Sequence, residues 1–122
     1  MIRPAPSRHA ARRRGIFAEQ LAAGWLRLKG YRVLARDFVH PVGEIDIVAR
    51  RGDVLAFVEV KYRTTAASAA EAIDMSKRRR VANAARAWLA AHPNDNGRSI
   101  RFDAMLMMPW RLPIHIRDAW RM

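Results

Sequence analysis

Four charged side chains flank a Gly-Asp pair at positions 52–53: Glu44, Asp46, Glu59 and Lys61. A Gly-Asp pair between two strand-like runs predicts a two-residue hairpin turn, in which the glycine takes the positive φ of a type II′ turn. In that register Asp46 lies opposite Glu59, and Glu44 lies opposite Lys61. Because side chains alternate along a strand, all four project from one face of the hairpin. The spacing therefore predicts a cluster of three carboxylates and one ammonium group.

Two ionised carboxylates at opposed positions repel each other. Their Cβ atoms are about 5 Å apart, and like charges at that distance repel by roughly 3 kcal/mol at an effective dielectric near 20. One explanation is a local ion-pair network, in which Lys61 neutralises the acids and Glu44 is its partner. The other is a divalent cation, Mg²⁺ or Mn²⁺, held by Asp46 and Glu59. Lys61 would then polarise a water molecule or stabilise a phosphorane-like charge.

The charge of the whole chain favours the second explanation. Among 122 residues, 23 Lys+Arg stand against 11 Asp+Glu, giving a formal net charge of +12. Such a surplus attracts polyanions, of which nucleic acid is the commonest, and phosphodiesters are what such a metal site cleaves. The lack of cysteine excludes disulfides, cysteine-ligated zinc, iron–sulfur clusters and thiol catalysis. With no apolar run of membrane length and no secretory signal, we expect a cytoplasmic protein without a membrane partner.

The elements that must position these side chains follow from hydrophobic periodicity and from glycine and proline breaks. Residues 1–11 predict a basic flexible arm, and residues 12–122 a single domain. The chain predicts two helices (12–29 and 74–91), a loop (64–70) and five strands (31–38, 44–50, 54–61, 100–107 and 114–116). This order predicts an α/β fold with a mixed central sheet of four to five strands flanked by helices.

The expected core comes from one face of each element. The first helix is expected to bury Phe17, Leu21, Trp25 and Leu28. The second helix is expected to bury Val81, Ala84, Ala85, Trp88 and Leu89. On the hairpin, the face opposite the charged cluster is expected to be pure core: Ile45, Ile47, Ala49, Val54, Ala56, Val58 and Val60.

Two basic runs are candidates for contacts with nucleic acid. One precedes the first apolar stripe, and the other begins the second helix: Arg12, Arg13, Arg14, Lys77, Arg78 and Arg79. Such runs are commonly just solvated. Lys77 lies four residues before Val81, on the buried side of the helix, from which it could reach a phosphate near the sheet edge. Cations at a helix N-terminus oppose the helix dipole, which indicates an anionic partner.

The hairpin sequence also resembles a known family. The run Gly43-Glu44-Ile45-Asp46-Ile47-Val48, followed by Phe57-Val58-Glu59-Val60-Lys61, resembles the PD-(D/E)XK nuclease superfamily. Together with shorter pieces such as Lys77-Arg78-Arg79 and Arg101-Phe102-Asp103, it is more closely similar to the YraN-like bacterial family, whose members are similar to Holliday-junction resolvases. The similarity spans most of residues 12–120.

The resemblance implies a restriction-endonuclease-like fold and metal-dependent cleavage of DNA. It makes Asp46 and Glu59 the metal-binding acids, with Mg²⁺ or Mn²⁺ as cofactor, and Lys61 the catalytic lysine. It also brings Glu19 to the same site as a helical carboxylate, although by spacing alone Glu19 is a solvent-facing residue. All four would be catalytic residues.

Two function classes therefore stay open. The first is a Mg²⁺- or Mn²⁺-dependent endonuclease that acts on branched or otherwise structured DNA. The second is a nucleic-acid-binding module that keeps the fold without cleaving. A homodimer would suit a two-fold junction, but the sequence shows no heptad repeat or obvious dimer patch.

Overall fold

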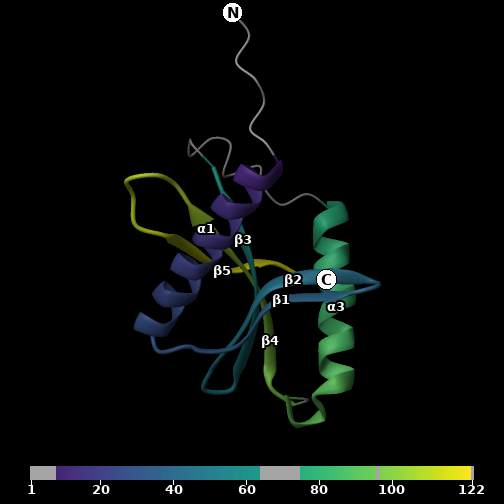
Figure 1. Ribbon diagram of the computed structural model, residues 1–122. Helices are drawn as coiled ribbons and strands as arrows, with labels where there is room; N and C mark the ends of the chain where they lie inside the picture. The colour runs from purple at the N-terminus through teal and green to yellow at the C-terminus, as the bar shows by residue number, and fades with distance from the viewer. Residues whose placement is uncertain (1–7, 64–74, 96, 122) are drawn as a thin grey trace, which may run out of the picture.

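The sheet has five strands in the order β1-β2-β3-β4-β5, with β3 and β4 parallel and the other neighbours antiparallel. This arrangement comes from a computed structural model that describes residues 8–63, 75–95 and 97–121, with side chains from residue 15 onward (Figure 1). The strands are β1 (Arg32–His40), β2 (Gly43–Arg51), β3 (Val54–Tyr62), β4 (Ser99–Met107) and β5 (Ile114–Trp120). The helices are α1 (Arg8–Leu28), α3 (Met75–Ala91) and the short 3₁₀ helix η1 (Pro93–Asp95). The expected α/β fold with a mixed sheet is confirmed.

The β2–β3 hairpin has the predicted register. Arg51 pairs with Val54, and the pairing continues to Ile47 opposite Val58. Gly52 has a φ of 57°, the left-handed conformation that the turn requires. The turn chemistry therefore fixes which residues of the two strands meet.

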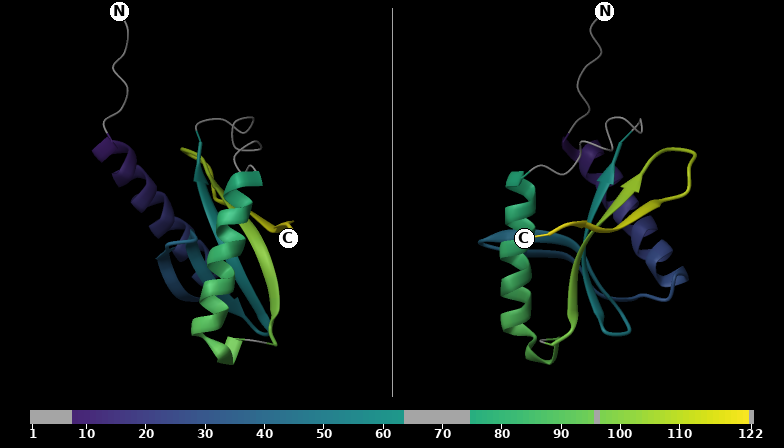
Figure 2. Two further views of the ribbon diagram at one scale, coloured as in Figure 1. Left: turned by 90° about the vertical axis from the view of Figure 1, so that its right-hand side faces the viewer. Right: turned by 180° about the vertical axis from the view of Figure 1, so that it is seen from behind.

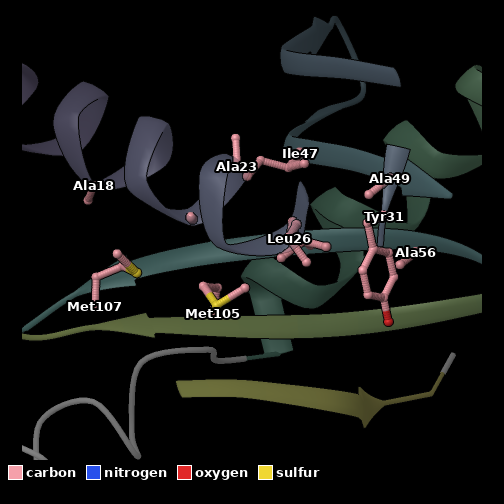
Figure 3. Close-up of a cluster of buried hydrophobic side chains, with 11 residues drawn as sticks. Ala18, Ala23, Leu26, Tyr31, Ile47, Ala49, Ala56, Met105 and Met107 are labelled. Carbon is pink, nitrogen blue, oxygen red and sulfur yellow. The ribbon is translucent and has the colours of Figure 1, made fainter. Parts of the chain in front are cut away.

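The two helices cover opposite faces of the central strands (Figure 2). Figure 3 shows the cluster beneath α1, where Leu26 and Ala23 pack on Ile47 and Met105. Beneath α3, the buried side chains of the second cluster include Val81 and Trp88 together with strand residues. The predicted stripe of the second helix is confirmed, since Val81, Ala84, Ala85 and Trp88 are buried and Leu89 packs against them.

The predicted core face of the first helix is wrong. Phe17, Leu21 and Leu28 are exposed, and Trp25 is only partly buried. The buried face consists instead of small residues and one leucine: Ala18, Ala22, Ala23 and Leu26. Alanines let α1 lie close to the sheet, so the side chains with the least apolar area face inward. The larger stripe then faces away from the core.

The strand β2 bends sharply between Ile45 and Ile47, so that it changes direction without a hairpin turn. In a regular strand these two side chains would share a face, but Ile45 packs in the α3 cluster and Ile47 in the α1 cluster. The prediction that Ile45 belongs to the same core face as Ile47 is therefore wrong. The β1–β2 hairpin curls over α3, where Phe38 makes an edge contact with Trp88 at 5.4 Å between ring centroids (Figure 1). Asp46 lies at this bend of β2.

The last strand runs to Trp120, beyond the predicted 114–116, because a buried acid anchors it to β4. Asp103 is fully buried, and its carboxylate accepts hydrogen bonds from Arg101 Nε at 2.8 Å and from the Asp118 N–H at 3.0 Å. His115 Nε2 lies 2.7 Å from the same carboxylate. Of these four residues, only His115 lies within the predicted segment 114–116.

Two expectations concern the edges of the described chain. α1 begins at Arg8, so the helix starts before the predicted residue 12. Residues 1–7 of the predicted arm and the predicted loop 64–70 lie outside the described residues. No helix in the described part of the chain is long and apolar enough to span a membrane.

Candidate functional site

Asp46 lies where β2 and β3 separate. The pairing of the two strands stops at Ile47 and Val58, and the next contact is made by a side chain: the Val60 N–H donates a hydrogen bond to Asp46 Oδ2 at 2.8 Å. The carboxylate thus takes the place of a backbone acceptor at the end of the ladder. This fixes Asp46 beside β3, next to the residue that follows Glu59.

Glu59 is buried, with 1% of its surface exposed. Its Oε1 lies 3.5 Å from Lys61 Nζ and 3.3 Å from Lys77 Nζ. Its Oε2 is also buried and has no hydrogen-bond partner among the described residues. An unpartnered carboxylate oxygen in the protein interior is costly. One oxygen of Glu59 therefore forms ion pairs with two lysines, and within the described part of the chain the other has a free position for a hydrogen-bond donor or a cation.

Lys77 reaches this point because α3 lies unusually close to the start of β2. A Cβ atom on Gly43 would be 1.9 Å from the Arg80 carbonyl oxygen, so only glycine allows this approach. The next residue, Glu44, then binds α3 through Lys77 Nζ at 3.3 Å and Arg80 Nη2 at 2.5 Å. The predicted pairing of Glu44 with Lys61 is wrong, because the sharp turn of β2 directs Glu44 to α3.

Burial governs the electrostatics of the two acids. Burial and, after it, the negative charge of Asp46 raise the pKa of Glu59 to about 7, against the lowering effects of Lys77 and Lys61. Burial also raises the pKa of Asp46, opposed by the Val60 hydrogen bond and by Lys77. For Lys77, burial lowers the pKa, but the charges of Glu59 and Asp46 outweigh it and the net direction is upward. The pair of acids therefore has a high affinity for added positive charge.

Glu19 faces the same region from α1. It lines a pocket of about 270 Å³ together with Asp46 and Asp37, and its Oε1 lies 3.4 Å from Arg36 Nε. Burial raises the pKa of Glu19, and the nearby Asp46 charge adds to the rise. The solvent-facing position expected from spacing alone is therefore wrong, and the position implied by the family resemblance agrees with the structure.

The residues predicted to contact nucleic acid have different surroundings. Lys77 forms an ion pair with Glu59. The Arg78 guanidinium lies over the Trp120 ring, 6.0 Å from its centroid, and Arg79 is exposed. The run Arg12–Arg14 lies in α1, and its side chains are outside the described residues. The first turns of α1 and α3 both lie at the end of the molecule where β3 ends (Figure 1).

The acids present suit a hard divalent cation. Glu59 Oε2 is a buried oxygen without a partner in the described chain, and Asp46 supplies a second carboxylate nearby. Clusters of three or more histidine, acidic or cysteine ligands are not found among the described residues. Mg²⁺ commonly takes only one or two protein carboxylates and completes its shell with water and phosphate oxygens. The donor set fits that pattern.

Comparison with known proteins places the chain in a family. The model of a family described as "Uncharacterised protein family UPF0102" matches residues 18–107. A UPF0102 protein of Paramagnetospirillum magneticum is 51% identical over 122 residues, covering 97% of this chain and 95% of that protein. A UPF0102 protein of Nitrobacter winogradskyi is 53% identical over 113 residues, covering 93% and 96%. The chain belongs to the UPF0102 family. The resemblance to the YraN-like family is thereby confirmed, and the matched UPF0102 segment contains Glu19, Asp46, Glu59, Lys61 and Lys77.

Sequence reasoning missed the role of Lys77 in this UPF0102 chain. It placed Lys77 on the buried side of its helix, which the structure confirms, but assigned it to a phosphate. The tight Gly43–Arg80 approach instead brings Lys77 to Glu59. The only sequence signal for this contact was the glycine immediately before Glu44.

Proposed function

We propose that this UPF0102 chain is a metal-dependent endonuclease that hydrolyses phosphodiester bonds in branched or structured DNA. The observation that carries the proposal is the buried Glu59 carboxylate, which has Asp46 beside it, one oxygen unpartnered, and Lys61 Nζ 3.5 Å from the other oxygen. Two acids and a lysine at the end of a hairpin are the groups that metal-assisted phosphodiester hydrolysis needs.

Asp46 and Glu59 would hold Mg²⁺ or Mn²⁺, since both are oxygen ligands and both have raised pKa values that favour a bound positive charge. When bound, the cation supplies Lewis-acid stabilisation of the charge that develops on the phosphate oxygens. The hairpin keeps Asp46 in place through the Val60 N–H, so the ligand is oriented before a substrate arrives.

Lys61 and Glu19 act on the reacting groups. The Lys61 ammonium has three donors, one of which faces Glu59, so the others can bind the attacking water or a phosphate oxygen. The water oxygen gives up a proton to solvent and forms the new bond to phosphorus, while the bond to the leaving oxygen breaks and that oxygen takes up a proton from solvent. Glu19 shares a pocket with Asp46, where it can accept a hydrogen bond from this water and orient it.

Two features support DNA as the substrate. The net charge of +12 attracts the phosphate backbone. The starts of α1 and α3, which are basic in sequence, lie at the end of the molecule where β3 ends (Figure 1). The preference for branched DNA rests on the similarity of the YraN-like family to Holliday-junction resolvases.

The contact between Lys77 and Glu59 favours a second candidate. Lys61 and Lys77 both lie beside Glu59, so their positive charges compensate the negative charges of the two acids without a metal. The site would then be an ion-pair network that stabilises a nucleic-acid-binding module without cleaving. The two candidates differ in metal-dependent turnover.

Cleavage of labelled duplex, flap and four-way junction DNA, with Mg²⁺, Mn²⁺ or EDTA, separates them. We expect the wild type to cleave branched substrates with metal only, and Asp46→Asn and Lys61→Ala to lose turnover while keeping DNA affinity. Asp53→Asn is the matched control, because Asp53 lies in the exposed hairpin turn. Lack of cleavage by the wild type with every metal and substrate would favour the binding module.

A thermal melt provides a readout that does not depend on turnover. Mn²⁺ should raise the melting temperature of the wild type, because a ligand that binds only the folded state stabilises it. Asp46→Asn should lose this shift, yet without metal it should melt at the same or a higher temperature, because it removes one of two repelling charges. A clearly lower melting temperature of Asp46→Asn without metal would mean that the acid is structural.

A further inference from the structure

An apolar groove lies outside the site, between the outer face of α1 and the segment that follows β4. It has a volume of about 1070 Å³. Its walls come from α1 and from the connection between β4 and β5, which Figure 1 shows beside α1. The large apolar side chains that line it are Phe17, Leu21, Leu28, Trp110 and Leu112. The α1 stripe that the sequence assigned to the core thus forms one wall of a surface groove.

Together these side chains expose more apolar area than the largest patch of a typical monomer. Trp110 is fully exposed, Leu28 is 82% exposed and Phe17 is 61% exposed. Counting about 200 Å² for a fully exposed large side chain, the five together present on the order of 700 Å² to solvent. The largest apolar patch on a typical monomer is about 300–600 Å², and larger patches mark interaction sites.

Trp110 is held in an unusual conformation. Its φ is 64°, in the left-handed region that bulky residues rarely adopt. It sits between Pro109 and Arg111 in the connection between β4 and β5, and its ring projects freely from the surface. A projecting aromatic side chain therefore lies next to an apolar hollow on the same face.

The charge of the lining indicates the kind of partner. Of the described residues that line the groove, Arg111 alone carries a charge, although the chain as a whole carries +12. A phosphate backbone has little to bind here. Two copies of a chain with this charge repel each other, so they can meet closely only through a face where charge is sparse.

We propose that this groove is the contact between two copies of the chain, with Trp110 of each copy seated in the groove of the other. A two-fold contact requires a self-complementary surface, and a projection next to a hollow provides one. The exposed apolar area is close to the about 800 Å² that each partner buries in an interface of standard size. The proposal goes beyond the nuclease function and does not depend on it.

The groove adjoins the candidate site. Ala18 and Tyr62 line both the groove and the pocket that holds Glu19 and Asp46. A second copy seated in the groove would lie beside this pocket, and the two-fold axis would relate two such sites to each other.

Sedimentation of the nuclease-treated, DNA-free protein tests the proposal. We expect a concentration-dependent dimer of the wild type that strengthens as salt rises, because salt screens the repulsion between the copies and does not weaken apolar contacts. Leu21→Glu and Trp110→Glu should each raise the dissociation constant by about 30-fold or more, as expected for central interface residues. Both positions are exposed, so circular dichroism should show unchanged folding.

Val39→Glu is the matched control, since Val39 is 70% exposed and does not line the groove. It should dimerise as the wild type does. A wild type that is monomeric at every concentration and salt overturns the proposal, because the groove then has another occupant. A dimer that persists in both groove variants, or one that dissociates as salt rises, overturns it too. None of these outcomes depends on metal or cleavage.

Discussion

The carboxyl group of Glu59 links the stability of the protein to pH. Burial and the charge of Asp46 raise its pKa to about 7, whereas the ordinary value is 4.5. Between these two pH values the folded state holds more protons than the unfolded state, so the free energy of unfolding falls as pH rises. The contribution of this group is therefore present below about pH 4.5 and lost above about pH 7.

We expect Glu59→Gln to remove this dependence. Gln cannot ionise, so the variant should gain stability relative to the wild type as pH rises from about 5 to 8, by on the order of 2–3 kcal/mol. Denaturant unfolding at several pH values, without metal, measures the difference. Glu44→Gln is the contrasting control: hydrogen bonds from Arg80 and Lys77 lower the pKa of Glu44, so its contribution is instead lost as pH falls. A difference between Glu59→Gln and wild type that stays constant with pH would contradict the buried ionisation.

The close approach of β2 and α3 depends on Gly43. The nearest atom to an added methyl group is a backbone carbonyl oxygen, which cannot move aside without shifting α3. We expect Gly43→Ala to destabilise the protein by about 1–3 kcal/mol and to draw Lys77 away from Glu44 and Glu59. Chemical denaturation measures the loss.

Gly15→Ala provides the comparison for this variant. Gly15 lies in α1 with no atom within 4 Å of an added Cβ, so Ala should be neutral or stabilise the helix by up to about 1 kcal/mol. Equal stability of the two Ala variants would show that the contact between Gly43 and Arg80 is not tight.

The local elements and the buried face of α3 could be predicted from the sequence, whereas the buried face of α1 could not. The two-residue turn at Gly52 determined the β2–β3 register without any distant contact. For α1, the periodicity of large apolar residues pointed to the face that carries Phe17 and Leu21. Close packing on the sheet instead buries the face that carries Ala18 and Ala22.

In the candidate site, too, local sequence predicted some contacts, and packing between distant elements decided the others. The closeness of Asp46 and Glu59 follows from the hairpin, whereas the partners of Glu44 follow from the turn of β2 and from the approach of α3. No spacing within one element carries that information. Glu19 likewise lines one pocket with Asp46 through the packing of α1 beside β2 and β3. The family resemblance implied this position, and the spacing within the helix did not.

At the scale of the whole molecule, the net charge of +12 predicts how DNA affinity responds to salt. If about six phosphates are contacted, the logarithm of the association constant should fall with the logarithm of salt concentration at a slope near −5. Fluorescence anisotropy of labelled duplex and junction DNA in EDTA measures the slope. A DNA affinity that does not change with salt would mean that the positive charge serves another partner. Since dimerisation should strengthen with salt, the two associations respond in opposite directions.

The parallel pairing of β3 and β4 has a consequence for the order of folding. β2 and β3 are joined by a two-residue turn, and hairpins of this kind form in about 1–10 μs. Val54 of β3, by contrast, pairs with Ser99 of β4, so that contact closes a long loop containing α3, which is slower. In a refolding chain Asp46 and Glu59 thus meet before α3 delivers Lys77. At that stage the repulsion between the two acids opposes the pairing, so we expect Asp46→Asn to refold faster than the wild type, as stopped-flow measurements without metal would show.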